Sequence, residues 1–195
     1  MRTSEKLMAI LTDMQVKSPV IILSDKPVLV KMLINAYQMM IASGRLLLEA
    51  VHGENNLSTY YLRHYKEETD HAGWLAVDLA TAGVNVNAAE INPLVAQLVG
   101  MQYYFIKHVH PAMLLGYMTV MECFPMAVSD VEMLERIYGL ELIRTVRFHA
   151  EHDISHGREV LAMVDTIEDE NVQQLIISAA IASMDKFNEI SRQLA

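Results

Sequence analysis

The sequence predicts an all-helical protein. Hydrophobic residues make up 52% of the chain, and they recur at steps of three and four residues, which is the spacing of one helix face. Fourteen methionines and an aromatic content of 7% indicate an adaptable interior built from flexible side chains. No segment has the alternating pattern of a strand. The 195 residues are enough for a sizeable core, and we expect one domain over residues 1–195.

Capping residues, prolines and glycines locate the first two helices. A short helix is predicted over residues 4–14 and is followed by an irregular stretch. Ser24 or Asp25 caps the next helix, because Pro27 then lies in its first turn, where its missing N–H is tolerated. That helix is expected to end just before Gly53, a residue type that often follows a helix.

The middle of the chain predicts three more helices. One long helix covers residues 57–82, with Gly83 just beyond its end. A fourth covers residues 88–109. A fifth starts at Pro111 and covers residues 111–124, because Pro125 cannot continue it.

Two further helices complete the chain. Asp130 is expected to cap the sixth, which Gly139 bends before a long stretch over residues 140–164. The last covers residues 171–193. Seven helices of these lengths predict a compact helical bundle.

Three polar residues interrupt the apolar face of the stretch over residues 140–164. His149, Asp153 and His156 follow steps of four and three, so their side chains point the same way on a helix. The residues that continue this line are apolar: Leu142, Val146, Val160, Met163 and Val164. Buried imidazoles and carboxylates need partners, and a metal ion is a partner that serves all three. For either histidine, the ordinary alternative is a hydrogen-bonded residue of the core.

The helix over residues 57–82 has the same pattern. Its apolar line contains His64, Glu68 and His71, and a glutamate three residues before a histidine is the pairing of di-iron sites in helical bundles. Glu67 lies one step away and is an alternative to Glu68. A solvated acidic face around these glutamates is the competing interpretation.

Glu122 supplies the third element on the helix over residues 111–124. It is a lone carboxylate on an apolar face, and such groups are rarely buried unpaired. A metal ion is one possible partner, and an ion pair with Arg144 or Arg147 is the alternative.

The three helices together offer a donor set for two metal ions. Carboxylate oxygen with imidazole nitrogen suits iron or manganese, and a bridging carboxylate suits a pair of ions. The predicted ligands are Glu68, His71, Glu122, His149, Asp153 and His156, with Glu67, His64 and His152 as further possibilities. Zinc is less attractive with a single cysteine.

Two nearby residues are expected to lie outside this site. Glu49 shares a polar line with Lys31, Gln38 and Arg45, which argues against a ferritin-style arrangement. Cys123 is expected to be a small core residue, because no activating base can be assigned to its thiol.

Charge and hydropathy restrict the classes of partner and the cellular compartment that we expect. A net charge of −9 without a cluster of lysine or arginine argues against nucleic acid. No signal peptide is apparent, and the apolar segment over residues 27–51 is too interrupted by polar residues for a membrane span. One cysteine excludes an internal disulfide, and we expect a cytoplasmic protein. The oligomeric state is left open, with a homodimer as one possibility.

These motifs resemble those of the heme-oxygenase-like di-iron oxidases, also called iron-containing redox enzymes. The resemblance covers roughly residues 30–190. It rests on Glu68-x2-His71, on Gly116-Tyr-Met-Thr-Val-Met-Glu122, and on His149-x3-Asp153-x2-His156 followed by Gly-Arg-Glu-Val-Leu. Many members have a glutamate seven residues before the first histidine, where this chain has His64, so the first-helix carboxylate stays open between Glu67 and Glu68.

The resemblance implies a heme-oxygenase-like bundle of about seven helices with two iron ions per chain. It also implies a non-heme di-iron oxidase or oxygenase that uses O2 on a small organic substrate, such as an amino-acid derivative, an amine or a fatty acid. Arg63 or Arg147 is a candidate to hold a substrate carboxylate. The alternatives are a metal-free thiaminase-like enzyme or cofactorless oxidase of the same fold, and a ferritin-like iron-binding protein.

Overall fold

The computed structural model describes all residues from Met1 to Ala195 and contains no strand. Nine α-helices and two short 3-10 helices make up the fold, which confirms the all-helical class. The helices are α1 (Thr3–Val16), α2 (Lys26–Glu49), α3 (Asn56–Glu68), α4 (His71–Thr81), η1 (Val86–Ala88), α5 (Pro93–His108), η2 (Pro111–Met113), α6 (Leu114–Glu122), α7 (Val128–Tyr138), α8 (Leu140–Asp165) and α9 (Glu170–Arg192).

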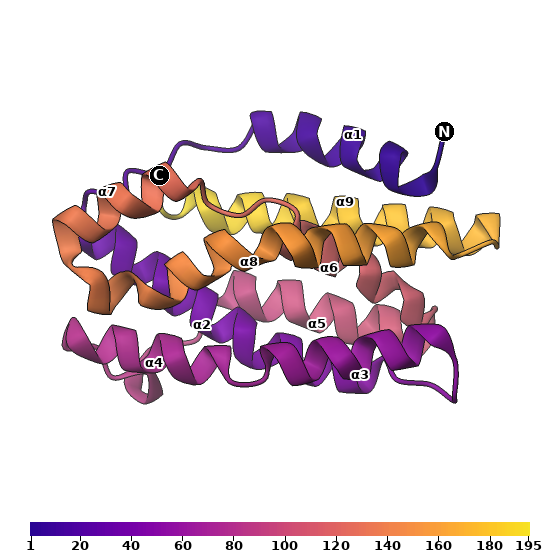
Figure 1. The fold of residues 1–195 in the computed structure, drawn as a ribbon, viewed down its shortest axis with the longest axis horizontal. Helices are drawn as coiled ribbons and strands as arrows, with labels where there is room; N and C mark the ends of the chain where they lie inside the picture. The colour runs from indigo at the N-terminus through magenta and orange to yellow at the C-terminus, as the bar shows by residue number, and fades with distance from the viewer.

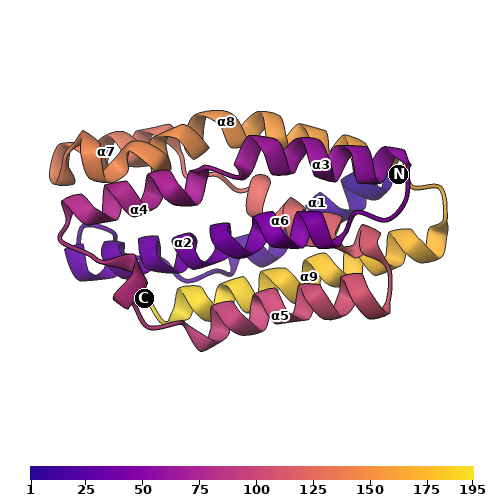
Figure 2. The same ribbon diagram turned by 90° about the horizontal axis from the view of Figure 1, so that it is seen from below.

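The helices form a bundle whose long members run along one common direction (Figures 1 and 2). The short helix α6 packs against both α8 and α9, and α2 packs against α3, α4 and α5. Helices α3 and α4 lie end to end and α4 packs beside α8, as both views show. No helix is long and apolar enough to cross a bilayer.

The helix count exceeds the predicted seven because two predicted helices are interrupted. Gly139 has a φ of +89°, which a side chain would disfavour, and it separates α7 from α8. The predicted helix over residues 57–82 is wrong as one continuous element: α3 ends at Glu68 and α4 begins at His71. Two glutamates and Asp70 meet at this point, and acidic residues are unfavourable at a helix C-terminus and favourable at an N-terminus.

The interruption after α3 leaves the buried face in register. Thr69 has φ −62° and ψ −27°, and Asp70 has φ −94° and ψ −13°, so both stay near helical values. As a result, His64 on α3 and His71 on α4 are both buried on the same side of the chain.

The interior contains two apolar clusters. The larger joins α1, α5, α6, α9 and the end of α2 to parts of α3 and α8, and the smaller joins the start of α2, α4, α7 and the first half of α8. On α8, Leu142 belongs to the smaller cluster and Val160 to the larger. The polar residues of α8 therefore lie between the two apolar clusters.

Candidate metal centre

Helix α8 positions three of the predicted ligands. It is continuous from Leu140 to Asp165, and its apolar line is buried at Leu142, Val160 and Val164, as predicted. The ring Nδ1 of His149 lies 2.9 Å from Oδ1 of Asp153, one turn on. This contact sets the orientation of the His149 ring and leaves its Nε2 free.

The junction between α3 and α4 contributes Glu68 and His71. The Nδ1 of His71 lies 2.7 Å from Oε2 of Glu68, although the two residues belong to different helices. The side chain of Glu68 is 14% exposed, whereas that of Glu67 is 41% exposed and lies 3.9 Å from Arg63. Of the two glutamates, Glu68 is therefore the one that faces the interior.

Glu122 ends α6 at a point where α6 closely approaches α8. A Cβ added at Gly157 of α8 would lie 3.0 Å from the Glu122 carbonyl oxygen, so the glycine permits this approach. The Oε1 of Glu122 is 3.3 Å from Nε2 of buried His64, and its Oε2 is 3.6 Å from Nδ1 of His156. Histidines are therefore the partners of this carboxylate.

The arginine partners considered for Glu122 are bound elsewhere. Arg144 pairs with Asp78, and Arg147 pairs with Glu135 and Glu151. The interpretation of Glu122 as the partner of either arginine is wrong.

The donor atoms gather into groups of three. Glu68, His71 and His149 form the junction cluster, and Glu122, Asp153 and His156 form the α6 cluster. Within each cluster the ligand atoms lie within 4.8 Å of one another. The ligand atoms of His64, Glu68 and His156 also lie within 4.8 Å of one another, so Glu68 and His156 connect the two clusters.

Three buried atoms of these clusters have no hydrogen-bond partner: Oε1 of Glu68, Nε2 of His149 and Nδ1 of His156. The last lies 3.2 Å from Oε1 of Glu68, so these two atoms form an ion pair, and only Nε2 of His149 has no partner of either kind. Buried polar atoms without partners cost free energy. Carboxylate and imidazole donors with unpaired atoms fit divalent metal ions, and no cysteine is part of the set.

The charges in the clusters depend on each other. The carboxylates of Glu122 and Glu68 raise the pKa of His156 to about 10. Burial raises the pKa of Glu68, but the imidazoles of His156 and His71 outweigh it and hold that pKa well below its usual range. Without metal, His156 is therefore a cation and Glu68 an anion at neutral pH.

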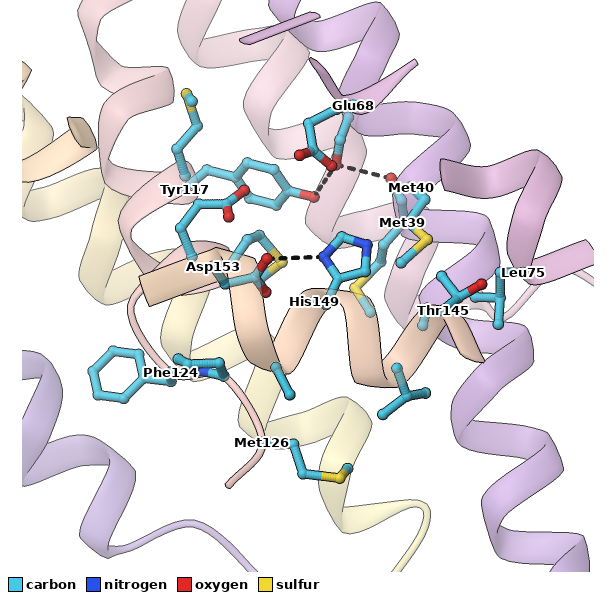
Figure 3. A pocket seen from close by; sticks show the side chains of 18 of the residues that line it. Met39, Met40, Glu68, Leu75, Tyr117, Phe124, Met126, Thr145, His149 and Asp153 are labelled. Carbon is cyan, nitrogen blue, oxygen red and sulfur yellow. Dashed lines mark hydrogen bonds and ion pairs between the residues drawn. The ribbon is translucent and has the colours of Figure 1, made fainter. Parts of the chain in front are cut away.

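A cavity of about 250 Å³ adjoins both clusters (Figure 3). Glu68, Glu122, His149 and Asp153 form one part of its wall, and most of the remaining wall is apolar. Tyr117 of α6 also lines it, with its hydroxyl 2.8 Å from Ser43 of α2. Sequence reasoning missed this pair, since nearly every residue of α6 is buried and no face stands out.

The remaining candidates lie apart from the clusters. His152 is exposed, and its Nδ1 lies 2.8 Å from the carbonyl oxygen of Phe148, consistent with its alternative as a surface residue. Glu49 pairs with Lys107. Cys123 is half-buried and donates to the Gly157 carbonyl oxygen, and burial with the nearby Glu122 carboxylate raises its pKa to about 12.

Comparison with known proteins identifies the fold. No family model matches the sequence, and no curated protein matches it. A solved domain of unknown function with a heme oxygenase-like fold, from Shewanella denitrificans OS217, superposes with a TM-score of 0.72. The match covers 97% of this chain and 89% of that chain at 15% sequence identity. The chain therefore has the heme-oxygenase-like fold that its motifs predicted.

Proposed function

We propose that the protein is an O2-dependent, non-heme di-iron oxidase or oxygenase that acts on a small organic substrate. One observation carries this proposal: two carboxylate–imidazole clusters from four helices share Glu68 as a neighbour and leave three buried donor atoms without a hydrogen bond. A carboxylate between two donor groups is the arrangement expected for a pair of hard metal ions.

The residues divide naturally between two ions. Glu68, His71 and His149 would hold one, and Glu122, Asp153 and His156 the other, with His64 close to both carboxylates. Two ferrous ions, when bound, would supply the electrons for reductive activation of O2.

The chain's own contribution is orientation and exclusion of water. Asp153 holds the His149 ring through Nδ1, so that Nε2 is presented to the cluster. His64 and His71, each 2% exposed, close the clusters from the α3–α4 side. Together with the mostly apolar cavity wall, they limit the water beside the clusters, which favours oxidation of a bound organic molecule over side reactions.

The alternative functions have less support. A ferritin-style site would use Glu49, which instead pairs with Lys107 away from the clusters. A thiaminase-like mechanism would need a reactive thiol, but the Cys123 thiol is bonded to a carbonyl oxygen, and Cys123 does not line the cavity. A cavity beside the clusters favours chemistry on an organic substrate over iron storage.

Oxygen uptake tests the proposal. The protein is loaded with ferrous iron anaerobically, mixed with O2, and its oxygen consumption is followed with an electrode, with zinc-loaded protein as a redox-inert reference. We expect uptake by the iron-loaded wild type and by His152→Ala, and its loss in His71→Ala and Asp153→Ala. Equal uptake by the cluster variants and the wild type would contradict the proposal, as would no uptake by an iron-loaded wild type.

A further inference from the structure

The cavity beside the clusters has a size that limits its occupant. Its volume is about 250 Å³, and it lies among α2, α6, α8 and the segment 124–126. An engineered apolar cavity of ~150 Å³ binds benzene, which has six heavy atoms, so this cavity would hold roughly ten.

The wall away from the clusters carries no positive charge. None of the 23 residues that line the cavity is a lysine or an arginine. Arg63 and Arg147, the candidates for holding a substrate carboxylate, do not line it. Arg63 pairs with Glu159, and Arg147 with Glu135 and Glu151. A carboxylate or phosphate in this part of the cavity would have no cation beside it.

The hydroxyl groups of the wall have no free proton to offer an anion. Ser43 donates to the carbonyl oxygen of Met39, so the Tyr117 hydroxyl donates to Ser43 in turn. The Thr145 hydroxyl donates to Asp78 at 2.5 Å. Each hydroxyl oxygen can therefore only accept, and an anion needs donors.

Methionine dominates the apolar wall. Six line the cavity: Met32, Met39, Met40, Met118, Met121 and Met126. Thioether side chains are flexible and polarisable, and they adapt to apolar chains or rings of differing shape. Figure 3 shows Met39 and Met40 close to His149, and Met126 drawn below the α8 ribbon.

We propose that the substrate of this site places an uncharged apolar chain or ring of about ten heavy atoms in the cavity, with any polar head group at the Glu68–His149–Asp153 end. A substrate with a negative charge elsewhere in its buried part is rejected, because the cavity wall offers that charge neither a cation nor a hydrogen-bond donor. The position of the head group rests on the proposed di-iron function, whereas the selection against charge in the body rests on the cavity wall alone.

A comparison of a monocarboxylate with a dicarboxylate tests the charge selection. Octanoate and octanedioate differ only at the end far from one carboxylate, so octanedioate held by one carboxylate at the Glu68–His149–Asp153 end brings its second carboxylate against the apolar wall. Isothermal titration of protein loaded anaerobically with ferrous iron should show octanoate binding and octanedioate binding at least ~10-fold more weakly. Equal affinities, or tighter binding of octanedioate, would overturn the proposal.

A cavity-filling variant tests the location. Ala36 of α2 lines the cavity, whereas Ala162 is exposed on α8. Octanamide, which is neutral, should bind the metal-free wild type and Ala162→Leu equally, and Ala36→Leu at least ~10-fold more weakly, since added methyl groups fill the space. Near-wild-type thermal unfolding of Ala36→Leu shows that the fold is retained. No binding of octanamide by the wild type, or no effect of Ala36→Leu, would overturn the proposal.

The two proposals can fail separately. If the protein binds no iron but octanamide still binds and Ala36→Leu weakens it, the di-iron function is wrong and the cavity assignment stands. If iron binds and O2 is consumed but octanamide and octanoate do not bind, the cavity assignment is wrong and the di-iron function stands.

Discussion

The junction cluster and the α6 cluster use the same residue types in different ways. In the α6 cluster, Glu122 lies between His64 and His156, so its carboxylate contacts two imidazoles without any metal. In the junction cluster, Glu68 contacts His71 and also His156, but Nε2 of His149 is buried and has no partner.

The two clusters differ in whether a buried donor atom is left without a partner. Ion pairs offset part of the cost of burial in both clusters, but the junction cluster also contains a buried nitrogen, Nε2 of His149, with neither a hydrogen bond nor an ion pair. The presence of metal-ligand residue types is therefore a weaker indicator of a metal site than the presence of donor atoms that the protein itself leaves unpaired.

The largest expected effect is that of Glu68→Ala, because Glu68 is near the ligands of both clusters. We expect iron content after anaerobic loading to fall from about two ions per chain to nearly none. Glu67→Ala is the matched control, since Glu67 is exposed and pairs with Arg63. If Glu68→Ala retains one full equivalent of iron, the clusters bind independently and Glu68 does not connect them.

Removal of a ligand specific to one cluster should have half that effect. His71→Ala for the junction cluster and Glu122→Ala for the α6 cluster should each lose about one iron ion per chain. The metal content is measured by elemental analysis, and His152→Ala, on the same helix as Asp153, should retain the wild-type value. Loss of both ions in either variant would mean that the two clusters act as one cooperative unit.

A buried carboxylate next to the junction cluster allows a test of stability. Asp78 of α4 is 1% exposed and accepts hydrogen bonds from the backbone N–H and the hydroxyl of Thr145 on α8, one turn before His149. Asp78→Ala should lower the free energy of unfolding by about 2–3 kcal/mol, the usual worth of hydrogen bonds to a charged group. Urea unfolding measures it, with exposed Glu141→Ala as the control. A loss below about 0.5 kcal/mol would show that this link does not hold α4 to α8.

The pairing in the α6 cluster predicts a pH dependence of the metal-free protein. His156 has a pKa of about 10 in the folded protein against an ordinary value of 6.5, so its protonated form is stabilised by folding. This stability is fully present below pH 6.5 and is lost as pH rises towards 10. Thermal unfolding temperatures across that range should fall more steeply for the wild type than for His156→Gln. The same slope in both proteins would mean that His156 is not held as a cation.

The smallest expected effect is that of Glu49→Ala. Glu49 pairs with Lys107 and lies apart from both clusters, so iron content should stay at the wild-type level. Loss of a full equivalent would instead favour a ferritin-style arrangement in which Glu49 is a ligand.

The periodicity of the sequence predicted the buried faces that carry the donors. On α8 the steps from His149 to Asp153 and His156 describe the observed helix. On α3 and α4 the same reasoning gave the correct face and the wrong element, because Thr69 and Asp70 keep near-helical angles across the interruption. Periodicity is sensitive to which side of the chain is buried and insensitive to a local loss of backbone hydrogen bonds.

Other features of the site depend on contacts between distant residues. The choice between histidine and arginine partners for Glu122 needed the packing of α3 and α8 around α6, since His64 is 58 positions away in the chain. The Ser43–Tyr117 pair joins α2 to α6 across 74 positions and has no local signal in the sequence. The choice of Glu68 over Glu67 likewise depends on which of two adjacent side chains faces α8.

The iron stoichiometry of the wild type tests the central claim most directly. The metal-free protein is titrated anaerobically with ferrous iron, excess iron is removed by gel filtration, and bound iron is measured per chain by elemental analysis. Two carboxylate–imidazole clusters predict about two iron ions per chain, with one lost in His71→Ala and one in Glu122→Ala. A wild-type protein that retains no iron would contradict the di-iron site. So would two variants that both retain as much iron as the wild type.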